Sequence, residues 1–360
     1  MEQTLIRMRE QILHATHRHL PLIIRGSGSK DFYGERARPA NADVLDTRAY
    51  SGITAYDPEE LVISARAGTP LAEIEAALAA RNQMLPFEPP YFGEGATLGG
   101  AIAAGLAGPR RAHAGAVKDF VLGVKMLNGK GEQLVFGGTV VKNVAGYDVS
   151  RLLAGSLGTL GLITDLSIKV LPKPFAETTL QFESRADEVA PRLNALMGQP
   201  LPLSASFWAD GILSLRLSGT EAGVQTAISL LGGTQMEDAA AAALWHAVRE
   251  QTLPLFAPES GKRLWRVSVP DTAALPASDG LVAIEWGGGL RWYQTDAAAR
   301  DMRALAQNAG GHATLFRGEA AAGETVFTPL PEAVLSINQR LKQSFDPSGI
   351  FNPGRLYPNL

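Results

Sequence analysis

The amino-acid sequence predicts an α+β protein with two domains and a C-terminal tail that returns to the first domain. Glycine-rich stretches are concentrated in residues 1–173, whereas strand and helix patterns alternate through residues 174–345. The segment Leu171-Pro172-Lys173-Pro174 separates these parts and is typical of a linker. Residues 346–360 read DPSGIFNPGRLYPNL, which contains too much Pro and Gly for a helix or a strand. We expect this tail to lie across the surface of the first domain.

Length and composition exclude several classes of protein. At 360 residues the chain is long enough for two hydrophobic cores. A net charge of −3 without a basic block argues against a nucleic-acid partner. No apolar run approaches the ~20 residues that cross a bilayer, and the N-terminus MEQTLIRMRE lacks the apolar core of a signal peptide. We therefore expect a cytoplasmic protein without a transmembrane segment. The sequence has no cysteines, so it offers neither disulfides nor thiolate ligands for an iron–sulfur cluster.

Hydrophobic periodicity predicts the elements of the first domain. Apolar side chains recur at helical spacing in residues 4–19, and Thr69-Pro70 is a natural N-cap and first position for the helix that follows it. Asn128-Gly129 is typical of a hairpin turn. The predicted order is helix 4–19, strand 20–24, strand 61–67, helix 71–81, a hairpin of strands 120–127 and 132–136, and a closing strand over 160–171.

The second domain, residues 174–345, is predicted to be an α+β cap with an antiparallel sheet and helices on one face. Strands are expected near 178–183, 204–217, 263–269, 281–286 and 290–294, and helices near 186–197, 221–231, 238–251, 297–309 and 331–345.

Two glycine-rich segments indicate backbone that another molecule approaches closely. Residues 89–123 contain too many glycines for a stable isolated helix, because each costs about 1 kcal/mol relative to alanine. The segment 25–30, RGSGSK, follows an apolar strand and can form a concave nest of N–H groups suited to phosphate. Two such surfaces suggest a dinucleotide. The common nucleotide motifs are absent: the third glycine of a Rossmann fingerprint falls at Asp31, and Gly129-Lys130 lies in the hairpin.

Five motifs in a characteristic order carry a family resemblance. They read IIRGSGSK, PFEPPYFGEGATLGGAIAAGLAGPRR, GAVKDFVLG, KNVAGYDVSRLLAGSLGTLGLITDLSIKVLP and DPSGIFNPGRL. This order resembles the vanillyl-alcohol-oxidase type of flavoprotein, which has a two-part FAD-binding domain of PCMH type. The likeness covers residues 20–173 and the last fifteen residues. More narrowly, LPFEPPYFGE, AGLAGPRR and NAGGHATLFR resemble the FAD-binding subunits of bacterial glycolate oxidases, along the whole chain.

The resemblance implies a set of FAD-binding residues. Arg25, Gly26, Ser27, Gly28, Ser29 and Lys30 would wrap the pyrophosphate, and Pro90, Thr97, Leu98, Gly99, Gly100, Ala101 and Ala103 would form the second wall. Gly108, Pro109 and Gly115 would continue along the ribityl chain, while Leu157, Gly158, Thr159, Gly161 and Ile163 would pass the adenine half. Asn352 on the returning tail would lie near the isoalloxazine.

Departures from the wider family limit the chemistry of this chain. Members with covalent flavin carry a histidine in or near the first loop, whereas no histidine lies between positions 19 and 113 here, so we expect non-covalent FAD. The family's histidine-rich metal site is also missing, and no metal is expected. His312 is the candidate general base, although a structural role competes with it. Arg291 and Arg317 could clamp a carboxylate, against a role in strand packing.

Four remaining positions have simpler explanations. His14 and His17 near the end of the first helix favour an interaction with the helix C-terminus over metal binding. His246 is expected at the surface or half-buried, and Asp148 is expected to cap the 149–154 segment instead of acting in catalysis.

The resemblance implies an FAD subunit of a complex that oxidises glycolate to glyoxylate. Its expected partners are a sister flavoprotein subunit and an iron–sulfur subunit, with attachment at the inner face of the membrane only through that complex. Two alternatives stay open: a structural assembly subunit with a vestigial flavin groove, and a self-sufficient FAD-dependent 2-hydroxyacid dehydrogenase that uses His312.

Overall fold

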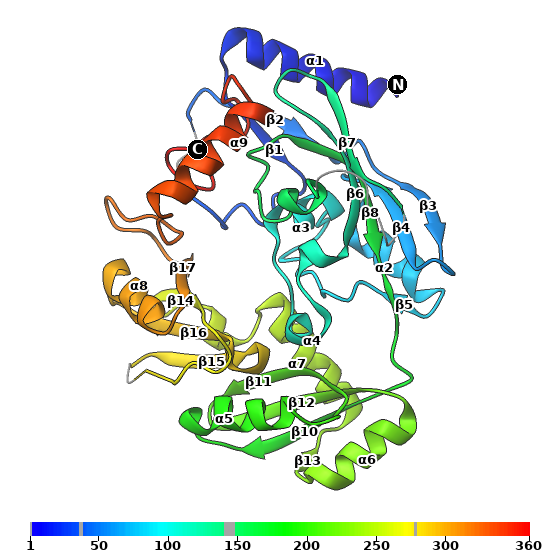
Figure 1. The fold of residues 1–360 in the computed structure, drawn as a ribbon, viewed down its shortest axis with the longest axis vertical. Helices are drawn as coiled ribbons and strands as arrows, with labels where there is room; N and C mark the ends of the chain where they lie inside the picture. The colour runs from blue at the N-terminus through cyan, green and yellow to red at the C-terminus, as the bar shows by residue number, and fades with distance from the viewer. Residues whose placement is uncertain (1, 36–38, 140–147, 277–278) are drawn as a thin grey trace.

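The structure is a computed structural model, and it describes residues 2–35, 39–139, 148–276 and 279–360. Its first domain is built on a five-stranded antiparallel sheet in the order β3-β4-β8-β6-β7 (Figure 1). The strands are β3 Ile53–Asp57, β4 Val62–Arg66, β8 Leu162–Lys169, β6 Val121–Leu127 and β7 Gln133–Gly137. The predicted hairpin and the predicted closing strand are confirmed. The linker residues Leu171–Pro172 form a short strand, β9, which pairs with β5 Gln83–Met84.

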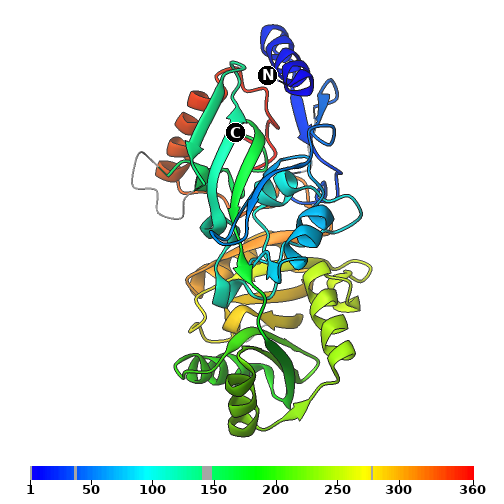
Figure 2. The ribbon, with the colours of Figure 1, turned by 90° about the vertical axis from the view of Figure 1, so that its right-hand side faces the viewer.

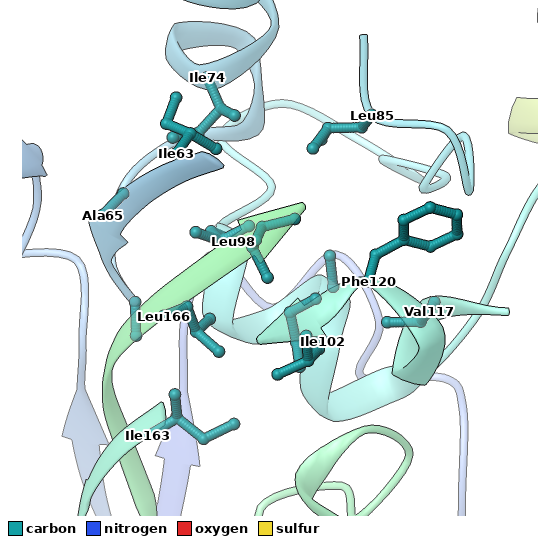
Figure 3. Packing of buried hydrophobic residues seen from close by; sticks show 14 of the residues in the cluster. Ile63, Ala65, Ile74, Leu85, Leu98, Ile102, Val117, Phe120, Ile163 and Leu166 are labelled. Atoms are coloured by element: carbon teal, nitrogen blue, oxygen red, sulfur yellow. The ribbon is translucent and has the colours of Figure 1, made fainter. Parts of the chain in front are cut away.

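Helix α3 (Leu98–Ala104) lies on this sheet and forms in spite of its two glycines. Thr97 caps its N-terminus, since the Thr97 Oγ1 atom accepts a hydrogen bond of 3.2 Å from the N–H of Gly100. Figure 3 shows Leu98 and Ile102 of α3 among the apolar side chains of the sheet, and both are fully buried. Burial of such side chains contributes roughly 1.5–3 kcal/mol each, which offsets the cost of the glycines.

Helix α2 (Leu71–Ala79) begins as predicted, but the expected cap is wrong. The Thr69 hydroxyl donates to the carbonyl of Arg66 at 2.7 Å and accepts from the N–H of Gly52 at 2.8 Å. Thr69 therefore joins the end of β4 to the preceding turn instead of capping the helix.

The N-terminal strand and the C-terminal tail lie side by side in the first domain. Helix α1 (Gln3–Arg18) buries Leu5, Met8, Ile12 and Ala15, whereas the apolar Leu13 is exposed. Strand β1 (Leu22–Arg25) pairs in parallel with β2 (Asp43–Asp46) on one side and meets Phe351 of the tail on the other. The tail thus returns to the first domain, as predicted.

The second domain contains an eight-stranded antiparallel sheet in the order β13-β10-β12-β11-β15-β16-β14-β17. The strands are β10 Ala176–Glu183, β11 Leu203–Ala209, β12 Ile212–Gly219, β13 Thr234–Gln235, β14 Arg263–Ser268, β15 Leu281–Glu285, β16 Leu290–Thr295 and β17 His312–Arg317. The single strand expected over 204–217 is wrong, because Asp210 and Gly211 take positive φ and turn the chain into a hairpin. Together with the first domain, this architecture confirms the α+β class.

Helices cover both faces of this sheet (Figure 2). The helices α5 (Ala186–Met197), α6 (Glu221–Leu231) and α8 (Ala299–Asn308) pack on one face. Helix α7 (Asp238–Glu250) lies on the other face, where Trp245 donates to the Thr179 hydroxyl at 2.8 Å and joins an apolar cluster with Leu106 and Leu157 of the first domain. The expectation that all helices share one face is therefore wrong for α7, whose apolar side chains fill the space between the domains.

Helix α9 (Glu332–Phe345) packs on the first domain, although the predicted boundary includes it in the second. Its Leu341 and Phe345 contact the core of the five-stranded sheet, and the ring of Phe345 lies 6.0 Å from that of Phe136 in β7. Figure 1 shows α9 in the same half of the molecule as the N-terminus, and in Figure 2 the red helix lies on the opposite side of the five-stranded sheet from the blue strands β1 and β2.

Candidate cofactor-binding site

Two adjoining cavities, of about 500 Å³ and about 400 Å³, form a groove along the first domain. They share six lining residues, Ile24, Gly26, Gly100, Ala103, Leu157 and Asn352. Most of the predicted site residues line the groove: Arg25, Gly26, Ser27, Gly28, Ser29, Lys30, Thr97, Gly99, Gly100, Ala103, Leu157, Gly158, Gly161, Ile163 and Asn352. These residues come from four segments that are far apart in the sequence, and the fold brings them together.

The loop after β1 presents backbone donors to the groove. Gly28 has a φ of +81°, a conformation that favours glycine. In the part of the chain that the structure describes, the N–H groups of Gly26, Ser27 and Gly28 donate to no protein acceptor. An ion pair of 2.8 Å between Arg25 and Asp31 closes the loop. Backbone donors in such a concave loop suit the oxygens of a phosphate group.

The walls of the groove approach each other so closely that two of its glycines have no room for a side chain. A Cβ atom on Gly26 would lie 2.5 Å from the Thr97 Oγ1 atom, at the start of α3. A Cβ atom on Gly158 would lie 2.6 Å from the Asn352 Nδ2 atom, and Gly158 has a φ of +73°. The absence of these side chains allows the first loop to lie against the start of α3 and the 157–158 turn to lie against the tail.

Asn352 holds two walls of the groove together. Its side-chain oxygen accepts a hydrogen bond of 2.9 Å from the N–H of Ile24, and its Nδ2 atom donates to the carbonyl of Leu157 at 2.6 Å. The side chain is 2% exposed. Asn352 therefore cross-links the end of β1, the 157–158 turn and the tail.

Lys30 turns its ammonium group toward the 91–92 segment. The Nζ atom donates to the carbonyl of Tyr91 at 3.1 Å. Burial lowers the pKa of Lys30 to about 8, and the carboxylate of Glu250 opposes part of this shift. Glu250 also accepts hydrogen bonds from the N–H groups of Tyr91 and Phe92, so α7 of the second domain holds this segment in place.

The remaining predicted residues lie outside the groove. Pro90 and Gly108 line a third cavity of about 320 Å³ between the domains, and Gly108 accepts a hydrogen bond of 3.1 Å from the Trp286 indole. Leu98 and Ala101 point into the core under α3. The predicted residues Pro109, Gly115 and Thr159 also line none of the three cavities. The carbonyl of Thr159 instead accepts a hydrogen bond from Lys342.

Six lining residues were not predicted from the sequence, namely Ile24, Asp31, Thr47, Ala67, Ala104 and Arg355. Arg355 donates to the carbonyls of Lys30 and Tyr33 at 3.0 and 3.1 Å and thereby binds the tail to the first loop. Its place in the motif NPGRL was the available signal. No feature of the sequence marks Thr47 or Ala67 as lining residues, because they lie at the ends of ordinary strands.

The candidate catalytic residues are dispersed. His312 is the first residue of the edge strand β17, not part of a loop. Partial desolvation and the charges of Arg266 and Arg111 lower the pKa of His312. Arg291 is buried and donates to the carbonyls of Gly288, Ala274 and Ala273. The guanidinium of Arg317 lies over the ring of Phe32 and donates to Gln251, so neither arginine is arranged as a carboxylate clamp.

Of two other positions, His246 agrees with the simpler explanation, whereas the expected cap at Asp148 is wrong, because Val149 is the N-cap of the next helix and no side chain caps it. His246 is exposed on α7. Asp148 accepts a hydrogen bond from the Ser150 hydroxyl at 3.2 Å and pairs with Arg151 at 2.9 Å, next to the short helix Ser150–Leu153. Gly146 and Tyr147, which precede it, lie outside the described residues. Among the residues that are described, no group of three or more His, Cys, Asp or Glu side chains could hold a metal ion.

Glu285 is a buried carboxyl group on the wall of the third cavity. Burial raises its pKa to about 7, although a hydrogen bond of 2.7 Å from the Trp292 indole opposes the shift. Because the folded state binds the proton of the Glu285 carboxyl group more tightly than the unfolded state does, ionisation of Glu285 lowers the free energy of unfolding as the pH rises. Between about pH 5 and about pH 8 we expect the wild type to lose about 2 kcal/mol more unfolding free energy than Glu285→Gln does. Urea denaturation across this range measures the difference, and parallel curves would contradict it.

Comparisons with known proteins agree with this geometry. A family model described as an FAD binding domain matches residues 8–150. The chain is 47% identical to the glycolate oxidase subunit GlcE of Escherichia coli (strain K12) over 351 residues, which cover 98% of this chain and 97% of the relative. It is 32% identical to the glycolate oxidase subunit GlcD of Bacillus subtilis (strain 168) over 161 residues, or 45% of this chain and 34% of that relative.

The fold itself is also found among solved structures. A structure of alkyldihydroxyacetonephosphate synthase superposes with a TM-score of 0.64 at 15% identity, covering 96% of this chain and 74% of the other. The resemblance that the five motifs indicate and the FAD-binding type of the fold are thereby confirmed. No helix within the described ranges is both long enough and apolar enough to cross a membrane.

Proposed function

The chain belongs to the family of the glycolate oxidase subunit GlcE, and from this premise we propose that it is an FAD-binding subunit of a complex that oxidises glycolate to glyoxylate. The observation that carries the proposal is the groove that Gly26, Gly99, Gly100, Gly158 and Gly161 line. Its two adjoining cavities and its backbone donors suit a dinucleotide, and the family model of an FAD binding domain spans the segments that form most of it.

The residues of the groove fit FAD in chemical character. The N–H groups of Gly26, Ser27 and Gly28 would receive the pyrophosphate, and Arg25 would offset its charge. Ile163 and Gly161 would border the adenine half. When bound, FAD supplies the capacity to accept two electrons from a 2-hydroxy acid and to pass them on singly. The protein contributes position, exclusion of water and the local electric field.

The partner subunits follow from the chemistry of electron transfer. Iron–sulfur clusters are held mainly by cysteine thiolates, and this sequence has no cysteine, so a cluster would belong to another chain. We propose a sister flavoprotein subunit and an iron–sulfur subunit, assembled on the cytoplasmic side of the membrane. The name of the relative, a glycolate oxidase subunit, supports assembly with other chains.

Purification of the tagged chain from its native host tests this function. We expect co-purification of a second flavoprotein and a cysteine-rich chain, with both flavin and iron in the sample and glycolate-dependent reduction of a dye. A colourless chain that still captures these partners would favour the assembly subunit instead. Dye reduction by the chain on its own, lost in His312→Ala, would favour the self-sufficient dehydrogenase.

The flavin is expected to be bound without a covalent link. No histidine or cysteine lines the groove, so the residues around it offer neither of these side chains for flavinylation. Acid precipitation of the purified protein should therefore release all of the yellow colour into the supernatant, where chromatography identifies FAD. Colour retained in the washed pellet would contradict this expectation.

A further inference from the structure

Two arginines from different domains lie against one indole ring. The guanidinium of Arg111, on the short helix Arg111–Ala114 of the first domain, is 4.4 Å from the centre of the Trp286 ring. The guanidinium of Arg266, in β14 of the second domain, is 4.9 Å from the same centre. Trp286 is 6% exposed and is anchored by its hydrogen bond to Gly108. We call this arrangement the Trp286 arginine pair.

Neither guanidinium has an acidic partner. Across the described residues, Arg111 and Arg266 make no hydrogen bond and no ion pair within 4.0 Å. The carboxyl group of Glu285 acts on the pKa of Arg266 through its charge, but Glu285 accepts its hydrogen bond from Trp292. Burial lowers the pKa of both arginines, and the charge of Arg266 lowers that of Arg111 further. An indole face attracts cations but does not neutralise two of them.

One arginine of the pair, Arg266, borders a cavity that is next to the groove, and Arg111 reaches this cavity only through the ring of Trp286. Arg266, Trp286 and Glu285 line the third cavity, together with Leu106 of the first domain. Ala104, two positions before Leu106, lines the groove. A small molecule in this cavity would thus be separated from the groove by only a short segment of chain.

We propose that Arg111 and Arg266 bind the carboxylate of a small 2-hydroxy acid beside Trp286. This inference rests on the proposed function and assigns the substrate end of the site to this chain. A guanidinium presents paired N–H donors that match the two oxygens of a carboxylate, and an anion between two such groups removes the repulsion between them.

Binding of oxalate to the full chain loaded with FAD tests the proposal. Oxalate is a two-carbon acid that carries no hydrogen to give up, so binding is measured without turnover. By isothermal titration calorimetry we expect Arg266→Gln and Arg111→Gln each to weaken oxalate binding at least about tenfold. The control Arg300→Gln, on α8, alters a side chain that is 89% exposed and should bind oxalate as the wild type does.

Oxalate binding tests this proposal, and flavin content is measured independently of it. Absence of oxalate binding by the wild type, or equal binding by the glutamine variants, would overturn it. The flavin absorbance of every sample reports on the proposed function, so loss of FAD and loss of oxalate binding are distinguished. Arg266→Lys keeps the charge without the paired donors, and binding weaker than wild type but tighter than Arg266→Gln would support recognition by the guanidinium.

Discussion

Lys342→Met is expected to lower the free energy of unfolding by about 3–5 kcal/mol, because it leaves a buried carboxylate without its partner. The Lys342 ammonium donates to Asp346 at 2.8 Å and to the carbonyls of Thr159 and Phe351 at 2.7 and 2.8 Å. Lys342 is 8% exposed and Asp346 is 1% exposed. This clasp joins α9, the tail and the loop that carries Thr159. Chemical denaturation followed by circular dichroism measures the loss.

A control on the same helix separates the clasp from a general effect on α9. Arg340→Met removes a positive charge from an exposed position and should change stability by less than about 0.5 kcal/mol. The double variant Lys342→Met/Asp346→Leu, which removes both charges, should recover part of the lost stability. Equal stability of Lys342→Met and Arg340→Met would show that the clasp contributes little.

Ala103→Phe is expected to lower FAD affinity at least about 100-fold, a loss of roughly 3 kcal/mol or more. Ala103 lies in α3 and lines both cavities of the groove, so a phenyl ring at this position would occupy space that the dinucleotide needs. The backbone of α3 accepts phenylalanine without strain, since the position is helical. Titration of the flavin-free protein with FAD, followed by flavin fluorescence, gives the dissociation constant.

Ala76→Phe provides the matched control for this prediction. Ala76 is an exposed position on the neighbouring helix α2, outside both cavities. We expect it to bind FAD as tightly as the wild type, with a circular dichroism spectrum shared by all three proteins. Undiminished affinity in a folded Ala103→Phe protein would mean that the cofactor lies elsewhere.

Periodicity predicted most helices and strands, and its failures have physical reasons. The strand β17 was missed because His312–Arg317 is short and follows a Gly-Gly turn, so the segment resembles a loop. The hairpin at Asp210-Gly211 was missed because apolar residues continue on both sides of the turn. The position of α7 could not be predicted, since an apolar stripe determines that a helix is buried but not which face of a sheet it covers.

The order of the motifs and the spacing of the glycines identified the cofactor and most of the groove from the sequence. Those features are local, because a missing side chain or a positive φ is a property of one position and its neighbours. Only the tertiary structure brought Arg111 and Arg266 to the same indole ring and Arg355 to the first loop. Contacts between residues so distant in sequence depend on how two sheets and the tail pack together, and no local pattern encodes that packing.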